Sequence, residues 1–529
     1  MSRYSVLPAG LSEKDFAVAI RAYRELLGEE NVLIDPKTLT AISKIMIAES
    51  ESLHMPSAVI RPQNVKEVQG AVLLANKYKT PLWMVSTGKN FGYGSAAPVT
   101  RGQIVMDLKR MNRIIEVDAE LAYAVVEPGV TYYDLNIYLE KNKIALIADM
   151  PAPSAIVGPL GNSIDRGLGY MPYGDHFLFS CGAEVVMPNG ELIRTGMGSM
   201  PNSKNWQVYK WGYGPYIDGI FSQGNYGILT KLGIWLMPGL PPGTYKHFLF
   251  TFPREDMAAE ILRTLVPLKM SGVLVGGQMV GHALYDMGAY CGYDPQGRLI
   301  NRSTFYEGKG KLPWSAVEEM MKRFDLGAWN LWGTLYGPPD IIELNWKIVT
   351  RAFRDRFGDA MKIFTDENRK GDIGYDYRTK LMRGVMTLQE FGLYNWRGGG
   401  GGMWLFTSAA ARPDQLTKQI QIVKHILDKF RLDYTAEFGL GWRDLHHGMD
   451  LLFDRTDPEE TQRAYDCYEE LVRVLAANTF GVYRTNTAFM KQVAATYGAE
   501  QNAVWYKLKK GLDPNNIIAP GKSGISLVS

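Results

Sequence analysis

Hydrophobic residues recur at helical spacing near the start of the chain, at Phe16, Ile20, Tyr23 and Leu27. Ser12 and Asp15 precede this run in the arrangement of a capping box, and Gly28 stands where a helix would end. The pattern therefore predicts an amphipathic helix between Ser12 and Gly28.

Helix and strand patterns alternate after this helix. They predict a strand over 56–60, an amphipathic helix over 65–78 and an apolar strand over 81–85 that leads into a glycine-containing loop. Two apolar runs flank Asn189-Gly190, the strongest local signal for a β-hairpin. These patterns indicate an α+β fold with antiparallel strand pairs.

The run Pro238-Gly239-Leu240-Pro241-Pro242-Gly243 interrupts regular structure. Helical patterns over 314–324 and 415–430 follow, mixed with short apolar strands. The irregular end of the chain, 514–522, is too short for a domain of its own, so we expect it to return to the first domain. We predict a first domain over 1–240, a second over 241–478 and a return segment over 479–529.

Composition favours a small-molecule partner. The chain has 529 residues and is 46% hydrophobic, and its 58 basic and 55 acidic side chains leave a net charge of only +3. This balance provides no large field to attract nucleic acid or anionic lipid. Aromatic residues make up 12%, which suits either a pocket for a ring or an ordinary core.

The spacing of the three cysteines indicates neither a disulfide framework nor a zinc site, because Cys181, Cys291 and Cys467 are far apart in the sequence. The start of the sequence shows no signal-peptide pattern, and no apolar run approaches the length of a membrane span. We expect a soluble protein. The pattern leaves bacterial cytoplasm and periplasm open, because export with a partner would leave no mark here.

The loop 86–94 follows the apolar strand at 81–85, and its glycines let several backbone N–H groups converge on an anion such as a pyrophosphate. The order is not that of a P-loop, and no Gly-x-Gly-x-x-Gly fingerprint occurs elsewhere. A tight turn is the alternative reading. A second glycine-aromatic loop, 161–176, carries polar groups suited to a ribose and to ring edges, with a structural loop as its alternative. There Asp165 and Arg166 could form a simple ion pair, and His176 could be a core histidine.

Two further clusters are ambiguous on their own. His446-His447, with Asp444, Asp450 and Glu437, lacks the spacing of a metal site, so we expect no metal and prefer a buried polar network. The glycines at 398–402 resemble a linker. Because Tyr394, Trp396, Met403 and Trp404 flank them, a flat surface approaching bare backbone is the sharper alternative.

Taken together, these segments resemble the vanillyl-alcohol oxidase and p-cresol methylhydroxylase family of flavoproteins, nearly end to end. The similarity is carried by residues 86–94, 161–176, 211–215, 389–402, 443–447, 482–486 and 519–524. It implies an α+β fold with two domains: an FAD-binding domain made by both chain ends, and an α+β cap domain that closes over the flavin.

The resemblance also selects a branch. The oxidase branch attaches FAD through a histidine just beyond the glycine run, where this chain has Gly402 and Met403. The methylhydroxylase branch, which includes 4-ethylphenol methylenehydroxylase, uses a tyrosine before Asn-Trp-Arg-Gly, and Tyr394 is that residue. The oxidase aspartate near flavin N5 is also missing, since Ala152 follows Pro151. The resemblance thus implies FAD bound covalently as an 8α-O-tyrosyl ether. Gly402 replaces a serine of the family pattern, which leaves the shape of the substrate open.

The implied reaction is oxidation of para-alkylphenols, such as 4-cresol or 4-ethylphenol, at the benzylic carbon. Hydride passes to flavin N5, and water adds to the resulting quinone methide to give the alcohol. The implied catalytic residues are Tyr93, Tyr483 and Arg484 around the phenolic oxygen, and a polar network of Glu390, Glu437, His446 and Asp450. Besides Tyr394, the implied FAD-binding residues are Thr87, Gly88, Lys89, Asn90, Phe91, Gly92, Gly158, Gly161, Asn162, Asp165, Gly169, Tyr170, Ile228 and Lys522.

The implied electron acceptor is a small cytochrome c subunit, and the implied assembly is a homodimer of flavoprotein subunits. An oxygen-using oxidase of the 4-alkylphenol or eugenol type is the alternative. A sugar or lactone oxidase that shares the FAD domain, and an electron carrier without a substrate, are the rival classes. Which alkylphenol is preferred stays open.

Overall fold

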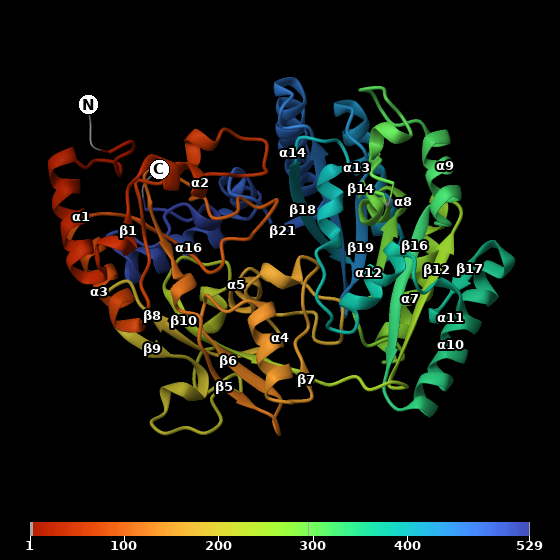
Figure 1. The fold of residues 1–529 in the computed structure, drawn as a ribbon, viewed down its shortest axis with the longest axis horizontal. Coiled ribbons are helices and arrows are strands. Elements are labelled where there is room, and N and C mark those ends of the chain that lie inside the picture. Colours follow the sequence, from red (N-terminus) through yellow and green to blue (C-terminus); the bar gives the residue numbers. More distant parts are fainter. Residues whose placement is uncertain (1–3, 295, 528–529) are drawn as a thin grey trace.

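The computed structural model describes residues 4–294 and 296–527. Two domains lie side by side (Figure 1). The first contains both chain ends, with helices and strands from residues before about 240 and the blue C-terminal helices, and the second contains the middle of the chain. The interrupted run at 238–243 lies between β11 (Met237–Pro238) and β12 (Tyr245–Phe252), the first strand of the second domain.

The first domain begins with a four-stranded sheet in the order β1-β2-β4-β3. Its strands are β1 (Val32–Leu33), β2 (Ala58–Ile60), β3 (Leu82–Val85) and β4 (Ile104–Asp107), and β4 is parallel to both β2 and β3. The helices around it are α1 (Glu13–Leu27), α2 (Pro36–Ile42) and α3 (Val65–Tyr78). The predicted helices are confirmed: the four apolar positions of α1 are buried, and Ser12 Oγ accepts a hydrogen bond from the Asp15 N–H.

A five-stranded antiparallel sheet completes the first domain, in the order β5-β6-β10-β8-β9. Its strands are β5 (Ile114–Asp118), β6 (Tyr123–Val126), β8 (Ser180–Val186), β9 (Leu192–Arg194) and β10 (Ile228–Trp235). Helices α4 (Tyr132–Lys141), α5 (Pro159–Ile164) and α6 (Asp218–Phe221) lie in its connections, and β7 (Leu146–Ile147) pairs with β11. Strands β8 and β9 form the antiparallel pair predicted around Asn189-Gly190.

The end of the chain lies against the first sheet. After α15 (Met490–Ala495) and α16 (Ala499–Leu512), Ile518 forms a parallel bridge with Leu82 of β3. The buried Lys509 side chain holds this return, because its Nζ donates to the backbone oxygens of Asn225 and Ile518 and pairs with Asp513 at 2.7 Å. Residues about 430 positions apart therefore build one layer.

The second domain is built on an eight-stranded antiparallel sheet in the order β17-β12-β16-β13-β19-β20-β18-β21. Besides β12, its strands are β13 (Met279–His282), β16 (Trp329–Tyr336), β17 (Lys362–Phe364), β18 (Gly401–Ala410), β19 (Ala436–Leu440), β20 (Asp444–Phe453) and β21 (Gly481–Arg484). Strands β14 (Gly292–Tyr293) and β15 (Leu299–Ile300) form a separate short hairpin.

The two faces of this sheet carry different residues because side chains alternate along a strand. On one face, Met403, Leu405, Met449 and Leu451 belong to a large apolar core shared with α7 (Ala258–Met270), α10 (Pro339–Phe357), α13 (Pro413–Phe430) and α14 (Pro458–Ala477). On the other face, Trp404, Met279 and Trp332 pack with aromatic residues of the first domain such as Tyr93 and Tyr170. Shorter helices complete this side: α8 (Ala283–Asp286), α9 (Trp314–Phe324), α11 (Asp366–Arg369) and α12 (Ile373–Leu381).

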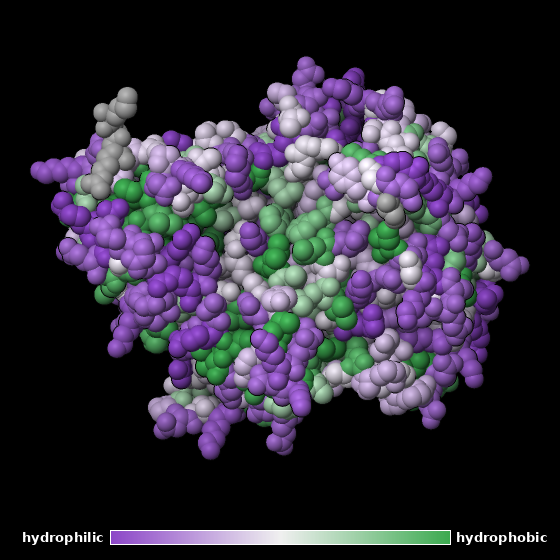
Figure 2. All heavy atoms as spheres, viewed as in Figure 1, coloured by the Kyte–Doolittle hydropathy of each residue, from purple (hydrophilic) through white to green (hydrophobic). Residues whose placement is uncertain are grey.

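On the face of the molecule shown in Figure 2, hydrophobic side chains gather around the middle, where the two domains meet, and hydrophilic ones cover most of the outer margins. Among the described residues, no helix combines the length and the apolarity needed to cross a bilayer. Because hydrophobic side chains gather at the junction of the two domains, this junction is the candidate location of a functional site.

Candidate active site

A cavity of about 540 Å³ opens within the first domain and reaches the second. Its walls come from the loop after β3, the segment around α5, the residues between α6 and β10, strand β21 and the two C-terminal helices. Three parts of the chain that are far apart in sequence thus meet around one space.

Most residues predicted to bind FAD line this cavity. They are Thr87, Gly88, Lys89, Asn90, Gly158, Gly161, Asn162, Asp165, Ile228 and Lys522. Gly88 has φ +67°, a conformation that side-chain-bearing residues rarely adopt, and a Cβ at Gly161 would collide with Ser86 Oγ. Glycine is therefore needed at position 88 for its backbone conformation, and at position 161 because the backbone there lies against the Ser86 side chain.

Asp165 connects the walls of the cavity. It accepts hydrogen bonds from Lys522 Nζ at 3.0 Å and from Asn90 Nδ2 at 3.2 Å, and Asn90 Oδ1 in turn accepts from Arg484 at 2.9 Å. Although burial disfavours its charge, Lys522 and Arg484 hold the pKa of Asp165 below its usual value. Arg166 donates to Ser222 Oγ instead, so the simple Asp165–Arg166 ion pair is not formed.

The other predicted cofactor residues lie outside the cavity wall. Phe91 packs edge-on against Phe391, and Gly92 lies so close to Trp404 that a Cβ would come within 2.5 Å of its ring. Tyr170 lies under the guanidinium of Arg378, in the aromatic cluster that faces the second domain. Gly169 is packed between the side chains of Asp149 and His176. His176 itself is buried and hydrogen-bonded to Asn162, as expected of a core histidine.

The structure brings Tyr93, Tyr483 and Arg484 together at one end of the cavity. The Arg484 guanidinium lies 4.1 Å from the centre of the Tyr93 ring, and all three residues line the cavity. Strand β21 places Tyr483 and Arg484 there, because it joins the edge of the large sheet with Arg484 opposite Phe406, whereas Tyr93 comes from the loop after β3. This end therefore presents one fixed positive charge and two phenol groups.

Strand register explains the acidic cluster on the adjacent face of the large sheet. Glu437 on β19 stands opposite Gly448 on β20, between His446 and Asp450 on the same face. Glu437 and Asp450 are 3% and 1% exposed. Glu390, from the segment that carries Tyr394, reaches the same region and accepts a hydrogen bond from Tyr285 Oη at 2.7 Å.

Arg378 on α12 is the counter-ion of this cluster, and no sequence pattern indicated it. Its NH2 group lies 3.2 Å from both Glu437 Oε2 and Asp286 Oδ1. The guanidinium is buried among four aromatic rings, those of Tyr170, Tyr285, Trp332 and Tyr377. Asp286 also accepts from Trp332 Nε1 at 3.1 Å. No spacing rule links α8, α12 and β19, so only the tertiary fold assembles this group.

The environment shifts the pKa values of these carboxyl groups upward. Burial raises the pKa of Glu437 to about 7, with repulsion from Glu390 and Asp286 adding to it and Arg378 opposing it. Burial and the Glu390 charge raise the pKa of Asp450 well above its usual value, and burial raises the pKa of Glu390. The cluster is thus able to take up protons near neutral pH.

Tyr394 lies in a short 3-10 helix, Gln389–Asn395, at the boundary of the two domains. Its Oη accepts a hydrogen bond from Trp404 Nε1 at 3.1 Å. Its ring rests on the backbone of Gly402, where a Cβ would come within 2.6 Å of the ring. Gly402 therefore makes room for the Tyr394 ring, which is the close approach to bare backbone that the glycine run indicated.

His446 and His447 point to opposite faces of the sheet. His446 pairs with the part-exposed Asp444 at 2.6 Å and meets the Tyr483 ring edge-on. His447 is buried on the helix side, where Tyr434 Oη lies 2.8 Å from its Nε2. Within the described parts of the chain, no three His, Cys, Asp or Glu side chains are grouped to hold a metal ion.

The cavity residues fit a dinucleotide cofactor such as FAD. A glycine loop follows a parallel strand, two cations flank Asp165, and apolar and aromatic side chains cover the rest of the wall. Sequence reasoning missed part of this wall: Gln501, Trp505 and Leu508 of α16 also line the cavity. Only the spacing of these three along a helix could have indicated that they share a face.

Comparison with known proteins covers both domains. The family model of the FAD binding domain matches residues 56–196, and the model of FAD linked oxidases, C-terminal domain, matches residues 316–523. The 4-cresol dehydrogenase [hydroxylating] flavoprotein subunit of Pseudomonas putida is 45% identical over 523 residues, covering 99% of this chain and 98% of that protein.

Solved structures show the same likeness. The crystal structure of p-cresol methylhydroxylase with substrate bound has a TM-score of 0.96 at 45% identity, covering 99% of this chain and 100% of that one. The 4-ethylphenol oxidase of Gulosibacter chungangensis, in its isoeugenol complex, has a TM-score of 0.93 at 34% identity, covering 98% and 99%. The similarity thus extends over the whole α+β arrangement of FAD-binding domain and cap.

Proposed function

We propose, because this chain belongs to the vanillyl-alcohol oxidase and p-cresol methylhydroxylase family of flavoproteins, that it oxidises the benzylic carbon of para-alkylphenols. The observation that carries the proposal is the placement of Arg484 beside Tyr93 and Tyr483 at the end of the cavity. A sugar or lactone oxidase would need hydroxyl-binding groups there instead of one cation and two phenols.

FAD is held by the loop 86–90, by the Gly158–Asp165 segment and by Lys522. When bound, it accepts the two electrons of the oxidation. The protein supplies the walls of the cavity, the positive charges of Lys522 and Arg484, and the face of the large sheet that packs against the first domain.

Arg484 has the task of holding the substrate as phenolate. A free phenol has a pKa of about 10 and is neutral at pH 7, so its ring cannot readily push electrons toward the para carbon. A fixed guanidinium near the oxygen favours the charged form, and each unit by which the pKa falls corresponds to about 1.4 kcal/mol. Loss of hydride from the benzylic carbon then leaves a para-quinone methide.

The acidic cluster orients the attacking water and accepts its proton. Addition of water to the quinone methide forms a C–O bond at the benzylic carbon, regenerates the phenolate and releases a proton. Glu437, whose pKa of about 7 lets it accept a proton, takes up this proton, while Glu390 and Asp450 orient the water. The product is a benzylic alcohol.

Tyr394 is the residue through which we expect FAD to be covalently attached. Its Oη is held by Trp404 and its ring by the backbone of Gly402. No histidine occupies the positions just beyond the glycine run. These features support an aryl ether at Tyr394.

We propose a c-type cytochrome subunit as the electron acceptor and a homodimer of this chain as the assembly. The 45% identical relative is described as a flavoprotein subunit, whereas the 34% identical relative is described as an oxidase. The difference in identity favours the cytochrome over oxygen.

One anaerobic titration tests this function. 4-Ethylphenol should bleach the flavin absorbance of the purified protein, and cytochrome c should restore it faster than air does. An electron carrier without a substrate would not bleach, and a sugar oxidase would bleach with a sugar but not with the phenol. Rapid recovery in air with peroxide formation would instead identify an oxidase.

A further inference from the structure

The segment that carries Tyr394 has little capacity to hold its own shape. A seven-residue 3-10 helix, Gln389–Asn395, precedes the glycine run, and Gly398, Gly399 and Gly400 all have φ between +62° and +76°. Short 3-10 turns have poor hydrogen-bond geometry, and successive glycines are the most flexible part of a chain. Something outside the segment must fix it.

Asp433, in the turn between α13 and β19, provides that hold. Its carboxylate is 2% exposed and accepts from Trp396 Nε1 at 3.0 Å and from Arg302 Nε at 2.7 Å. Arg397 Nε lies 3.4 Å from the same oxygen. One buried carboxylate thus contacts the two residues that follow Asn395, at the junction with the glycines.

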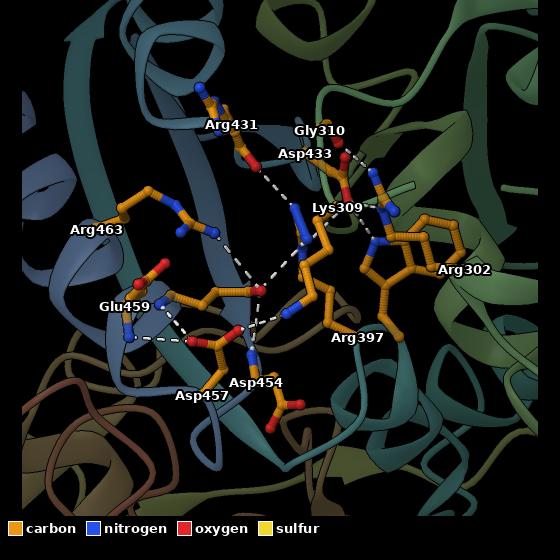
Figure 3. A network of polar contacts seen from close by, with 12 residues as sticks. Arg302, Lys309, Gly310, Arg397, Arg431, Asp433, Asp454, Asp457, Glu459 and Arg463 are labelled. Atoms are coloured by element: carbon orange, nitrogen blue, oxygen red, sulfur yellow. Dashed lines mark hydrogen bonds and ion pairs between the residues drawn. The ribbon is translucent and has the colours of Figure 1, made fainter. Parts of the chain in front are cut away.

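Arg302 and Glu460 complete the clamp. The backbone N–H of Arg302 donates to the Trp396 carbonyl at 3.0 Å, while its guanidinium donates to the carbonyls of Gly308 and Gly310. Arg397 NH1 pairs with Glu460 Oε1 at 3.2 Å, and its NH2 donates to the Arg431 carbonyl at 2.7 Å. Figure 3 shows Arg397 reaching from Asp433 across to the α14 side of this network.

The carboxylates of this clamp are matched by guanidiniums. Asp433 and Glu460 face Arg302 and Arg397, whose side chains are 7% and 5% exposed, and Arg463 also lies 3.7 Å from Glu460. Removing one partner of a buried ion pair leaves its counterpart uncompensated, which is strongly unfavourable. The clamp therefore fixes the backbone two and three residues after Tyr394, whereas Trp404 contacts only the tip of its side chain.

We propose that Asp433 is a positioning residue for covalent attachment of FAD, acting through Trp396 and Arg397 on Tyr394. This inference rests on the proposed tether at Tyr394. Bond formation between groups held in place requires the reacting atoms to stay about 3–3.5 Å apart, and a displacement of about 1 Å slows such reactions about 100-fold. A clamp outside the cavity can therefore govern attachment without touching the cofactor.

The chemistry of attachment is an oxidation. The Tyr394 O–H bond and one C–H bond of the cofactor's 8α-methyl group are exchanged for a C–O bond, with release of two protons. The two electrons enter the ring system of the cofactor and leave to the electron acceptor that serves turnover. Attachment is therefore measured with FAD and an artificial electron acceptor both present.

Asp433→Asn tests the proposal. Full-length apoprotein is mixed with saturating FAD and the acceptor, and the flavin retained in the acid-precipitated pellet is followed over time. We expect the rate of attachment to fall at least tenfold, while the affinity for FAD measured in Tyr394→Phe and in Asp433→Asn/Tyr394→Phe stays equal, because Asp433 does not line the cavity. A merely structural role would lower affinity and stability without this separation.

Two variants control for folding. Glu184→Gln breaks another buried carboxylate that binds two cations, Arg194 and Lys231, and should lose stability yet attach FAD at the wild-type rate. Trp396→Phe removes the indole N–H from Asp433 together with part of a buried ring, and leaves the guanidiniums of the clamp in place. It should slow attachment less, providing the test if Asp433→Asn does not fold.

Three outcomes distinguish the proposed clamp at Asp433 from the proposed tether at Tyr394. Attachment at the wild-type rate in Asp433→Asn, or in Trp396→Phe where only that variant folds, overturns the clamp and leaves the tether standing. A colourless wild-type pellet overturns the tether and the clamp with it. Slow attachment with unchanged FAD affinity supports both.

Discussion

The two ends of the candidate site differ in how they hold charged groups. At the cavity end, Arg484 is a single cation held by Asn90 and placed over the Tyr93 ring. At the cap end, Glu437 and Asp286 contact the guanidinium of Arg378, and two further buried carboxyl groups, Glu390 and Asp450, lie in the same cluster. The cavity end thus holds one fixed positive charge, whereas burial raises the pKa values of the carboxyl groups at the cap end.

The imbalance at the cap end follows from simple electrostatics. Two buried carboxyl groups share the NH2 group of Arg378, and the charge of a third, Glu390, raises the pKa values of Glu437 and Asp450. Burial without a matched cation makes a carboxyl group retain its proton instead of its charge. The difference between the two ends matches the two proposed roles: Arg484 holds the substrate as phenolate, and Glu437 accepts the proton.

Arg484→Ala should have the largest effect on this comparison. Removing the cation takes away the guanidinium that lies on the Tyr93 ring and next to Tyr483, and truncating one partner of a desolvated charge pair costs about 4 kcal/mol. We expect kcat/KM for 4-ethylphenol to fall roughly 1000-fold. Inhibition by phenols should weaken far more than inhibition by non-phenolic ring analogues, and an equal loss for both would show that Arg484 does not bind phenolate.

Glu437→Gln should have the next largest effect, through pH. In the wild type, the pKa of about 7 means that the carboxylate able to accept a proton appears only as the pH rises through 7. The variant should lose this ascending limb, and its turnover above pH 7 should fall roughly 100-fold, the low end for a general base. Steady-state rates from pH 5 to 9 measure it; an unchanged profile would assign the proton acceptor elsewhere.

Stability gives the same substitution a second, independent readout. The folded pKa of Glu437 lies above its unfolded value of about 4.3, so the native state binds more protons and wild-type stability falls as pH rises from about 4 to 7. Glu437→Gln removes this pH dependence, which totals about 4 kcal/mol. Glu184 is the matched control: its ion pairs with Lys231 and Arg194 outweigh burial and lower its pKa, so Glu184→Gln changes the slope with the opposite sign. Denaturant titrations at several pH values compare them.

The two ends also differ in how far the sequence predicted them. At the cavity end, only the family resemblance implied Tyr483 and Arg484 on β21, but the segment 86–94 is contiguous, and its glycine pattern is local and typical of an anion-binding loop. The hairpin at Asn189-Gly190, α1 and α3 were predicted for the same reason: turn chemistry and helical periodicity are local properties.

The cap end depends on register, which the sequence does not state. Glu437, Asp450 and His446 share a face only because β19 pairs with β20 so that Glu437 stands opposite Gly448. Arg378 and Asp286 join them from two helices with no motif in common. Tyr170 illustrates the same limit: its loop was assigned to FAD, yet its ring lies under Arg378 on the cap side, where long-range packing and not loop composition decides.

Tyr285→Phe should have the smallest effect, because it removes a single hydrogen bond at the cap end. Tyr285 Oη donates to Glu390 Oε1 at 2.7 Å and opposes the rise in the Glu390 pKa that burial causes. Losing one such hydrogen bond costs about 1 kcal/mol, so we expect turnover to fall roughly fivefold. The ascending pH limb of Glu437 should move downward, because a more readily protonated Glu390 repels the Glu437 carboxylate less.

Tyr290→Phe is its matched control, because Tyr290 Oη donates to Asp372 at the same 2.7 Å from the neighbouring turn, away from the carboxyl cluster. If both variants slow turnover equally and neither moves the pH limb, the loss reflects packing of this turn. A shift of the limb in Tyr285→Phe alone would show that the proton affinity of the acidic end is set by individual hydrogen bonds as well as by burial. The contrast with Arg484 would then be one of mechanism: a single fixed charge at one end, and a shared, adjustable proton load at the other.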